Sequence, residues 1–136
     1  MATTTATVTI SSADLTGDAL ALSTTTTLTK AQSANTGLEQ TTGVARKYYA
    51  TAKTAEVLLD ASDYTTGTQA TKVYVKNLST TKSETVTLQL NNSSVTIELG
   101  KLYGGDWAFF PWDGANDIEI DTSATAMTVE YFVIFE

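Results

Sequence analysis

From residue 44 onward the chain alternates apolar and polar residues in short runs that are separated by turn-forming residues. Alternation with a period of two is typical of half-buried strands. It predicts eight strands, at residues 44–51, 55–60, 72–77, 84–90, 94–99, 107–110, 117–121 and 126–135. Short strands at this spacing predict an all-β fold, an antiparallel β-sandwich. Eight strands in two sheets is the jelly-roll number, and an immunoglobulin-like sandwich is the alternative.

The clearest hairpin lies at residues 84–99, where two alternating runs flank the sequence Asn91-Asn92-Ser93-Ser94. The side-chain amides of Asn and hydroxyls of Ser favour a turn. We expect the apolar residues of both runs to face the core. These residues are Val86, Leu88, Leu90, Val95, Ile97 and Leu99.

The three runs that follow differ in which faces are apolar. The run 107–110 is expected to end at Pro111, because proline cannot donate to a sheet ladder. In the run 117–121, Ile118 and Ile120 are expected inside and the acidic residues outside. In the last run, one face carries Met127, Val129, Tyr131, Val133 and Phe135, and the other face carries Phe132 and Ile134. A strand that is apolar on both faces is expected to be covered on both faces.

Residues 1–42 form a separate, Thr-rich segment that precedes the sandwich domain at 43–136. Residues 7–10 alternate and predict one strand, and residues 20–29 predict a second. Residues 30–43 are polar and loop-like, with one helical turn considered at 30–34. We consider two interpretations: a strand pair in the same sheet as the sandwich, or an extended arm on a neighbouring subunit. Apolar side chains are sparse here, so an isolated arm could hardly offset its ordering entropy.

The net charge of −7 comes entirely from the last third of the chain. Residues 102–136 contain seven acids and no Lys or Arg, whereas residues 1–101 contain eight of each sign. A pI near 4.4 argues against binding nucleic acid through its phosphates. No apolar run approaches the ~20 residues of a membrane span, and the start of the chain has no signal-peptide pattern. We therefore expect neither nucleic acid nor membrane as a partner.

The chain contains no His and no Cys. A Ser-His-Asp triad and a thiolate zinc site are therefore impossible. A Ser-Lys pair remains formally possible, but no motif supports it. We expect a non-enzymatic protein that needs no cofactor.

Two ligand sites are conceivable in the acidic segment. Trp107 and Trp112, with neighbouring acids, could form a sugar-binding loop, although acids in turns and aromatics in a core are the interpretation we favour. Asp113, Asn116 and Asp117 could offer oxygen ligands to calcium. They lack the EF-hand register, and Asx-Gly clusters are ordinary turn chemistry.

Four residues are candidates for a protein–protein interface. Phe132 and Ile134 lie on a strand that already has a core face, and the pair Tyr48 and Tyr49 adds large aromatic surface. Excess apolar surface of this kind marks interaction sites. The alternative is that both faces of the last strand belong to the core of the same chain.

The order of motifs in residues 70–136 resembles the small β-sandwich virion proteins of tailed bacteriophages, including head decoration (cement) proteins and tail-associated modules. The resemblance rests on KVYVKN at 72–77, the hairpin at 86–97, LYGGDWAFFPW at 102–112, DIEI at 117–120 and VEYFVI at 129–134. These are strand-order and turn patterns, without a catalytic signature.

The resemblance implies a capsid decoration or cement protein that stabilises the shell by symmetric contacts with the major capsid protein or other virion proteins. It implies a homo-oligomer, often a trimer, on the outer surface of the particle, made in the host cytoplasm. The acids fit this location, because a negative surface facing packaged DNA would be repelled. The alternative is a tail- or fibre-associated module that binds a receptor or carbohydrate.

Overall fold

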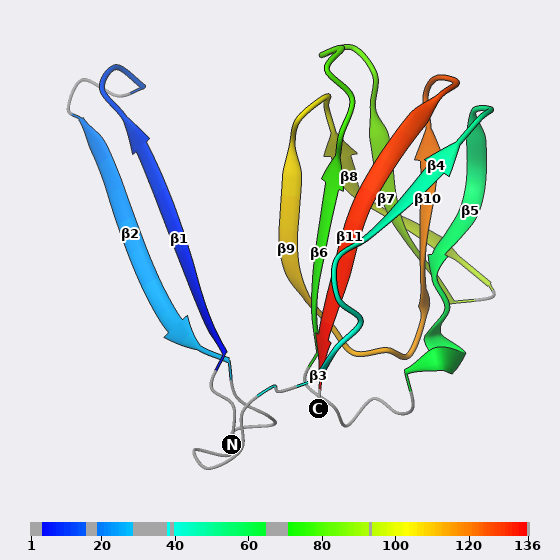
Figure 1. The fold of residues 1–136 in the computed structure, drawn as a ribbon, viewed down its shortest axis with the longest axis horizontal. Helices are drawn as coiled ribbons and strands as arrows, with labels where there is room; N and C mark the ends of the chain where they lie inside the picture. Colours follow the sequence, from blue (N-terminus) through cyan, green and yellow to red (C-terminus); the bar gives the residue numbers. More distant parts are fainter. Residues whose placement is uncertain are drawn as a thin grey trace.

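The computed structural model describes residues 4–15, 19–28, 38, 40–64, 71–92 and 94–135. Within them the chain is all-β, with two antiparallel sheets packed as a sandwich and a hairpin that stands apart from it (Figure 1). The strands are β1 (Thr5–Ser12), β2 (Leu20–Thr27), β3 (Gln40–Thr41), β4 (Ala45–Tyr49), β5 (Lys53–Leu59), β6 (Thr71–Asn77), β7 (Val86–Asn91), β8 (Thr96–Leu102), β9 (Trp107–Trp112), β10 (Asp117–Thr122) and β11 (Met127–Phe135). One 3-10 turn, η1 (Ala61–Asp63), follows β5.

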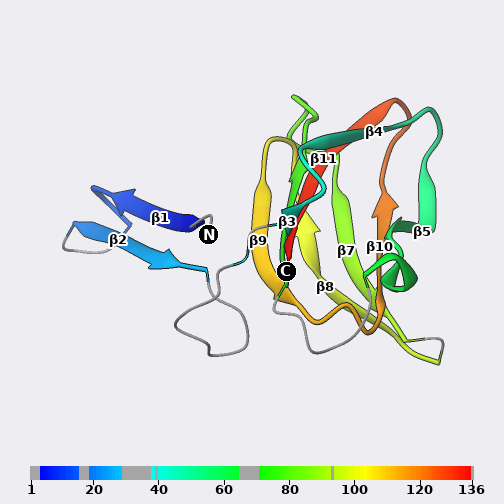
Figure 2. The same cartoon turned by 60° about the horizontal axis from the view of Figure 1, so that its bottom comes forward.

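From β3 onward the chain crosses repeatedly between the two layers, except that β3 and β4 share one sheet and β7 and β8 share the other (Figure 2). One sheet has the order β5-β10-β7-β8, and the other has β3-β11-β6-β9 with β4 also paired to β11. The eight strands from β4 onward pair as one rolled hairpin: β4 with β11, β5 with β10, β6 with β9 and β7 with β8. The predicted antiparallel sandwich is confirmed, and its jelly-roll form stays a prediction with which this pairing agrees.

Each of the eight predicted strands corresponds to one strand from β4 to β11. Two local details were wrong. The polar stretch before Gly43 contains the short strand β3, which pairs with the end of β11. Strand β9 does not stop before Pro111 but continues through it to Trp112. Proline is tolerated there because β9 pairs only with β6 and forms an edge of its sheet.

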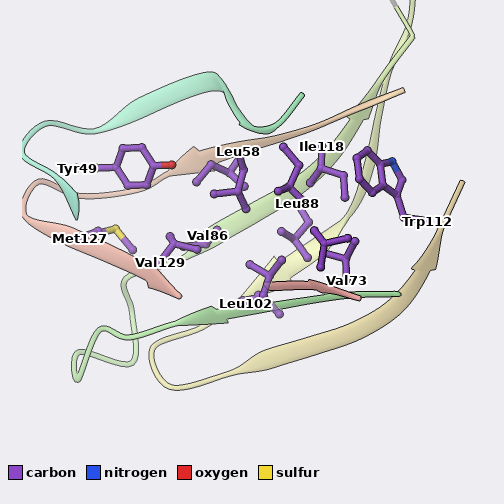
Figure 3. Close-up of a cluster of buried hydrophobic side chains, with 14 residues drawn as sticks. Tyr49, Leu58, Val73, Val86, Leu88, Leu102, Trp112, Ile118, Met127 and Val129 are labelled. Carbon is purple, nitrogen blue, oxygen red and sulfur yellow. The ribbon is translucent and has the colours of Figure 1, made fainter. Parts of the chain in front are cut away.

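The core lies between the two sheets and is apolar (Figure 3). Strands β6 and β11 contribute Val73, Val75, Val129 and Val133, which alternate with outward residues and are fully buried. The β7 and β10 strands cover them from the other sheet with Val86, Leu88, Ile118 and Ile120. Burying a large aliphatic side chain contributes about 1.5–3 kcal/mol, so this layer is the main source of stability for the domain.

The prediction that the second arm of the β7–β8 hairpin returns to the core was wrong. Val95, Ile97 and Leu99 are each about half exposed. The register shifts between Leu88 and Gln89, and the outer end of the hairpin reaches beyond the neighbouring strands (Figure 2). Because of this shift, Gly100 and Leu102 lie opposite Leu88 and Val86, so the alternation read from Val95 to Leu99 does not continue along the strand.

The N-terminal strands β1 and β2 pair with each other in a sheet of their own. The interpretation that places them in the same sheet as the sandwich is therefore wrong. Three hydrogen bonds hold the open end of this hairpin, its root, where β1 begins and β2 ends. They join Leu28 N to Thr4 O (2.9 Å), Leu38 N to Leu28 O (3.1 Å), and Thr4 Oγ1 to Leu38 O (2.8 Å). The helical turn considered at 30–34 lies outside the described residues.

Candidate functional site: an aromatic sheet face

The outward face of the β11-β6-β9 sheet carries a cluster of aromatic and apolar side chains. The strand register sets Phe132, Tyr74 and Phe109 side by side across the three strands. On one side of this row Trp107 lies beside Lys76, and on the opposite side of the row Ile134 lies beside Lys72. We call the set Tyr74, Trp107, Phe109, Phe132 and Ile134 the aromatic face.

The rings of the aromatic face stack on one another. The Tyr74 ring lies 4.9 Å from that of Phe132, at an interplanar angle of 19°, and 6.4 Å from that of Trp107, at 30°. Trp107 is 53% exposed, and the other members are half-buried. None belongs to the core cluster or to the side chains packed against it. The rings therefore form a preorganised platform outside the core, and aromatic side chains of this kind are enriched at protein interfaces.

Charged side chains border the platform. On β6, Lys72 and Lys76 lie on either side of Tyr74, and Glu130 lies opposite Lys76 on β11. The Glu130 carboxylate accepts a hydrogen bond of 2.8 Å from Nε of Arg46 on the neighbouring β4. Burial, and then the nearby Glu130 carboxylate, raise the pKa of Tyr74 above its ordinary value. Among the described residues these neighbours are three bases and one acid, whereas the whole chain is acidic.

The outward face of the other sheet is polar and internally bonded. Glu119, in the middle of β10, accepts a hydrogen bond of 2.7 Å from Asn91 Nδ2. Asp121 accepts one of 3.0 Å from Gln89 Nε2. The acids of β10 do lie outside the core, as predicted, but Glu119 is buried among its neighbours rather than solvated. The two outer surfaces thus differ: one is aromatic with basic borders, and the other is acidic and hydrogen-bonded.

The four candidate interface residues separate in the structure. Phe132 and Ile134 lie on the aromatic face, outside the core cluster. Tyr48 is 62% exposed on the same side of the sheet, where it pairs with Thr128. Tyr49 is 2% exposed and lies in the core beneath β11, so it is not available to a partner. Consecutive residues of a strand point to opposite faces, which separates Tyr48 from Tyr49.

Trp107 and Trp112 do not form one ligand loop. They lie five positions apart on the single strand β9 and therefore face opposite sides of it. Trp112 is 5% exposed; its ring contacts that of Tyr64 edge-to-face at 5.2 Å, and its Nε1 donates to the Asn116 carbonyl at 2.9 Å. Only Trp107 is accessible, so the two rings cannot bind the same sugar.

The residues considered for calcium serve the local backbone. Asp113 Oδ1 accepts a hydrogen bond of 2.9 Å from Ala115 N, and Asp117 Oδ1 accepts one of 2.7 Å from Ala61 N. Asn116 contributes its carbonyl to Trp112. Across the described ranges, no three His, Cys, Asp or Glu side chains gather in a group that could hold a metal ion. These bonds favour the turn interpretation of the loop.

Two members of the aromatic face were missed at the level of sequence. Tyr74 lies between Val73 and Val75, and if these two apolar residues face the core, Tyr74 faces outward. Phe109 is separated from Trp107 by a single residue and must share its face. What the sequence lacked was the order of the strands, which brings these residues beside Phe132.

Comparisons with family models, with curated proteins and with solved structures give no match. Among the described residues, no helix is long and apolar enough to cross a membrane. We therefore infer function from the surfaces of the chain itself.

Proposed function

We propose that this chain is a non-enzymatic structural protein that binds other proteins of a larger particle through its aromatic face. The observation that carries the proposal is the row Phe132–Tyr74–Phe109, which lies outside the core and is bordered by Trp107 and by charged residues. An aromatic centre within a polar rim is the usual composition of a protein interface. Side chains that are already stacked lose little conformational freedom on binding.

Within this class we propose a capsid decoration protein of a tailed bacteriophage, bound to the major capsid protein on the outside of the shell. The resemblance in residues 70–136 and the unequal outer surfaces support this assignment. In this arrangement the aromatic face makes protein contacts on the particle, and the sheet that contains Glu119 and Asp121 faces the solvent. Many copies of a modest contact, repeated by symmetry, would raise the barrier to shell rupture.

The test is binding to shells assembled from the cognate major capsid protein, measured by co-sedimentation. Phe132→Glu and Trp107→Ala should each weaken binding at least about tenfold, because removing an aromatic anchor from an interface commonly costs about 1–2 kcal/mol or more. Thr96→Glu is the matched control, since Thr96 is exposed on the outer side of the other sheet. Full binding by both aromatic-face variants, with folds intact by circular dichroism, would contradict the proposal.

A second candidate function is carbohydrate binding by a tail- or fibre-associated module. The observation that favours it is the exposed Trp107 ring stacked beside Tyr74, since a flat aromatic surface can pack against the apolar face of a sugar ring. Trp112 is excluded from this site by its burial. Glycan-array binding that is lost in Trp107→Ala, in a protein that does not bind shells, would favour this function over the first.

A further inference from the structure

The β1–β2 hairpin has two unlike faces. The strand register places Val8 opposite Thr24, Ile10 opposite Leu22 and Ser12 opposite Leu20, so the apolar side chains share one face. The other face carries hydroxyls, with Thr7 Oγ1 and Thr25 Oγ1 at 2.7 Å and Thr9 Oγ1 and Ser23 Oγ at 3.2 Å. We call the face that contains Val8, Ile10, Leu20 and Leu22 the apolar arm face.

The apolar arm face is open in the single chain. Ile10 and Leu22 are each 49% exposed, although they are directly opposed across the hairpin. Neither β1 nor β2 pairs with a strand of the sandwich, and the hairpin projects away from it (Figure 1). A lone two-stranded hairpin is at best marginally stable in water. The fold of the arm therefore gains stability if another surface covers this face.

The aromatic face has the properties of that surface. It is apolar and outside the core, and it is built on strands of seven, nine and six residues, close to the eight residues of each arm strand. The charges are also complementary. Residues 1–29 contain two acids, Asp14 and Asp18, and no base. In the described part of the chain, the aromatic face is bordered by three bases, Lys72, Lys76 and Arg46, and by the acid Glu130.

We propose that the arm of one copy of this chain packs its apolar face on the aromatic face of a second copy. The hydrogen bonds among Thr4, Leu28 and Leu38 hold the hairpin root, so the arm projects from its own sandwich as a formed hairpin. Different surfaces meet in this contact, and a contact of this kind gives a closed oligomer where the rotation between successive copies closes. The inference rests on the proposed function in one respect: it takes the aromatic face to be an assembly surface.

Complementation between two full-length variants tests the inference. Leu22→Asp disables the arm and keeps the aromatic face, whereas Phe132→Glu disables the aromatic face and keeps the arm. Each variant alone should be monomeric by size-exclusion chromatography with light scattering. An equimolar mixture should form a heterodimer, because one intact arm and one intact aromatic face then meet. Thr25→Asp, on the hydroxyl face of the arm, is the control and should keep the wild-type oligomer.

Several outcomes would overturn the inference. They are a wild-type protein that is monomeric at high concentration, a Leu22→Asp variant of wild-type mass, and a mixture that stays monomeric. A Phe132→Glu protein that keeps its mass while Leu22→Asp does not would mean that arms pack on arms. Trp107→Asp, at the most exposed ring of the aromatic face, provides a second aromatic-face variant if Phe132→Glu is misfolded. Wild-type monomers that still bind shells would overturn this inference and leave the proposed function standing.

Discussion

The backbone amide of Ala55 donates a hydrogen bond of 2.7 Å to Oδ1 of Asp121 on the neighbouring strand. Ala55 has a φ of +50°, in the left-handed region that side chains other than glycine rarely occupy. The pairing of β5 with β10 is irregular at this point, between Lys53 and Glu56. The carboxylate of Asp121 therefore helps to hold a bulged backbone that an alanine would otherwise disfavour.

Ala55→Gly should stabilise the protein. The left-handed conformation costs an alanine about 1–2 kcal/mol, and the greater freedom of glycine in the unfolded chain offsets about 0.5–1 kcal/mol of the gain. We expect a net increase of about 0.5–1 kcal/mol in the free energy of unfolding, measured by urea denaturation. Asp121→Ala should lower stability by about 1–3 kcal/mol, because it leaves the Ala55 amide without its acceptor. A lower free energy of unfolding in Ala55→Gly would contradict the backbone strain that we infer at Ala55.

Tyr49→Phe should also stabilise the protein at neutral pH. The Tyr49 ring is 2% exposed, and its hydroxyl lies in the core without a hydrogen-bond partner among the residues that the structure describes. Removing a buried, unpartnered polar group recovers about 1–3 kcal/mol of desolvation free energy, while phenylalanine keeps the ring packing. Tyr48→Phe is the control, since Tyr48 is exposed and should change stability by less than about 0.5 kcal/mol. Loss of stability in Tyr49→Phe would show that the hydroxyl makes a bond.

Alkaline pH should unfold the protein through its tyrosines. Burial, first among the causes, raises the pKa of Tyr49 far above its ordinary value of 10.0, and it also raises the pKa of Tyr64 and Tyr74. The fold favours the neutral phenols, so their contribution is complete below pH 10 and is lost as the pH rises above it. Each such proton contributes a slope of about 1.4 kcal/mol per pH unit. Tyr49→Phe should make the decline above pH 10 shallower, as measured by urea denaturation at fixed pH.

The sequence was most informative where one sheet face is buried. Alternation around Val73, Val75, Ile118 and Ile120 located four core positions, because a one-residue slip would expose an entire apolar set. It failed where the outcome depends on which strands are neighbours. Nothing local indicates that Ile97 lies on a hairpin end beyond the opposite sheet.

The candidate site was predictable only in part, for the same reason. Phe132 and Ile134 were recognised as interface candidates because they lie on the outward face of a strand whose other face already packs in the core. Their assembly with Trp107 and Phe109 depends on β6 lying between β11 and β9, which brings together residues more than 20 positions apart. Tyr49 was misjudged as an interface residue, whereas the burial of Trp112 agrees with the favoured interpretation of core aromatics, because aromatic residues near turns are as suitable for a core as for a surface.

Gly104→Ala should be strongly destabilising. Gly104 is buried in the turn between β8 and β9, where an added Cβ would collide with the carbonyl oxygen of Thr81 and lie 2.9 Å from that of Ser79. Backbone atoms cannot move aside as a side chain can, so we expect a loss of about 2–4 kcal/mol or failure to fold. Gly43→Ala is the control: its Cβ would meet open space, and only its φ of +72° should cost about 1 kcal/mol. Equal losses would contradict the close packing at Gly104.

The two tryptophans should respond oppositely to truncation. Trp112→Ala removes a core ring at 5% exposure together with the hydrogen bond to the Asn116 carbonyl, and we expect a loss of about 3–5 kcal/mol in the free energy of unfolding. Trp107→Ala removes a ring at 53% exposure and should cost about 1 kcal/mol or less, mainly its stacking on Tyr74. Fluorescence gives a second readout, because the tryptophan left in Trp107→Ala should emit at shorter wavelength than the native pair. A Trp107→Ala protein as unstable as Trp112→Ala would mean that the aromatic face is part of the folding core, which would remove the basis for assigning it to a partner.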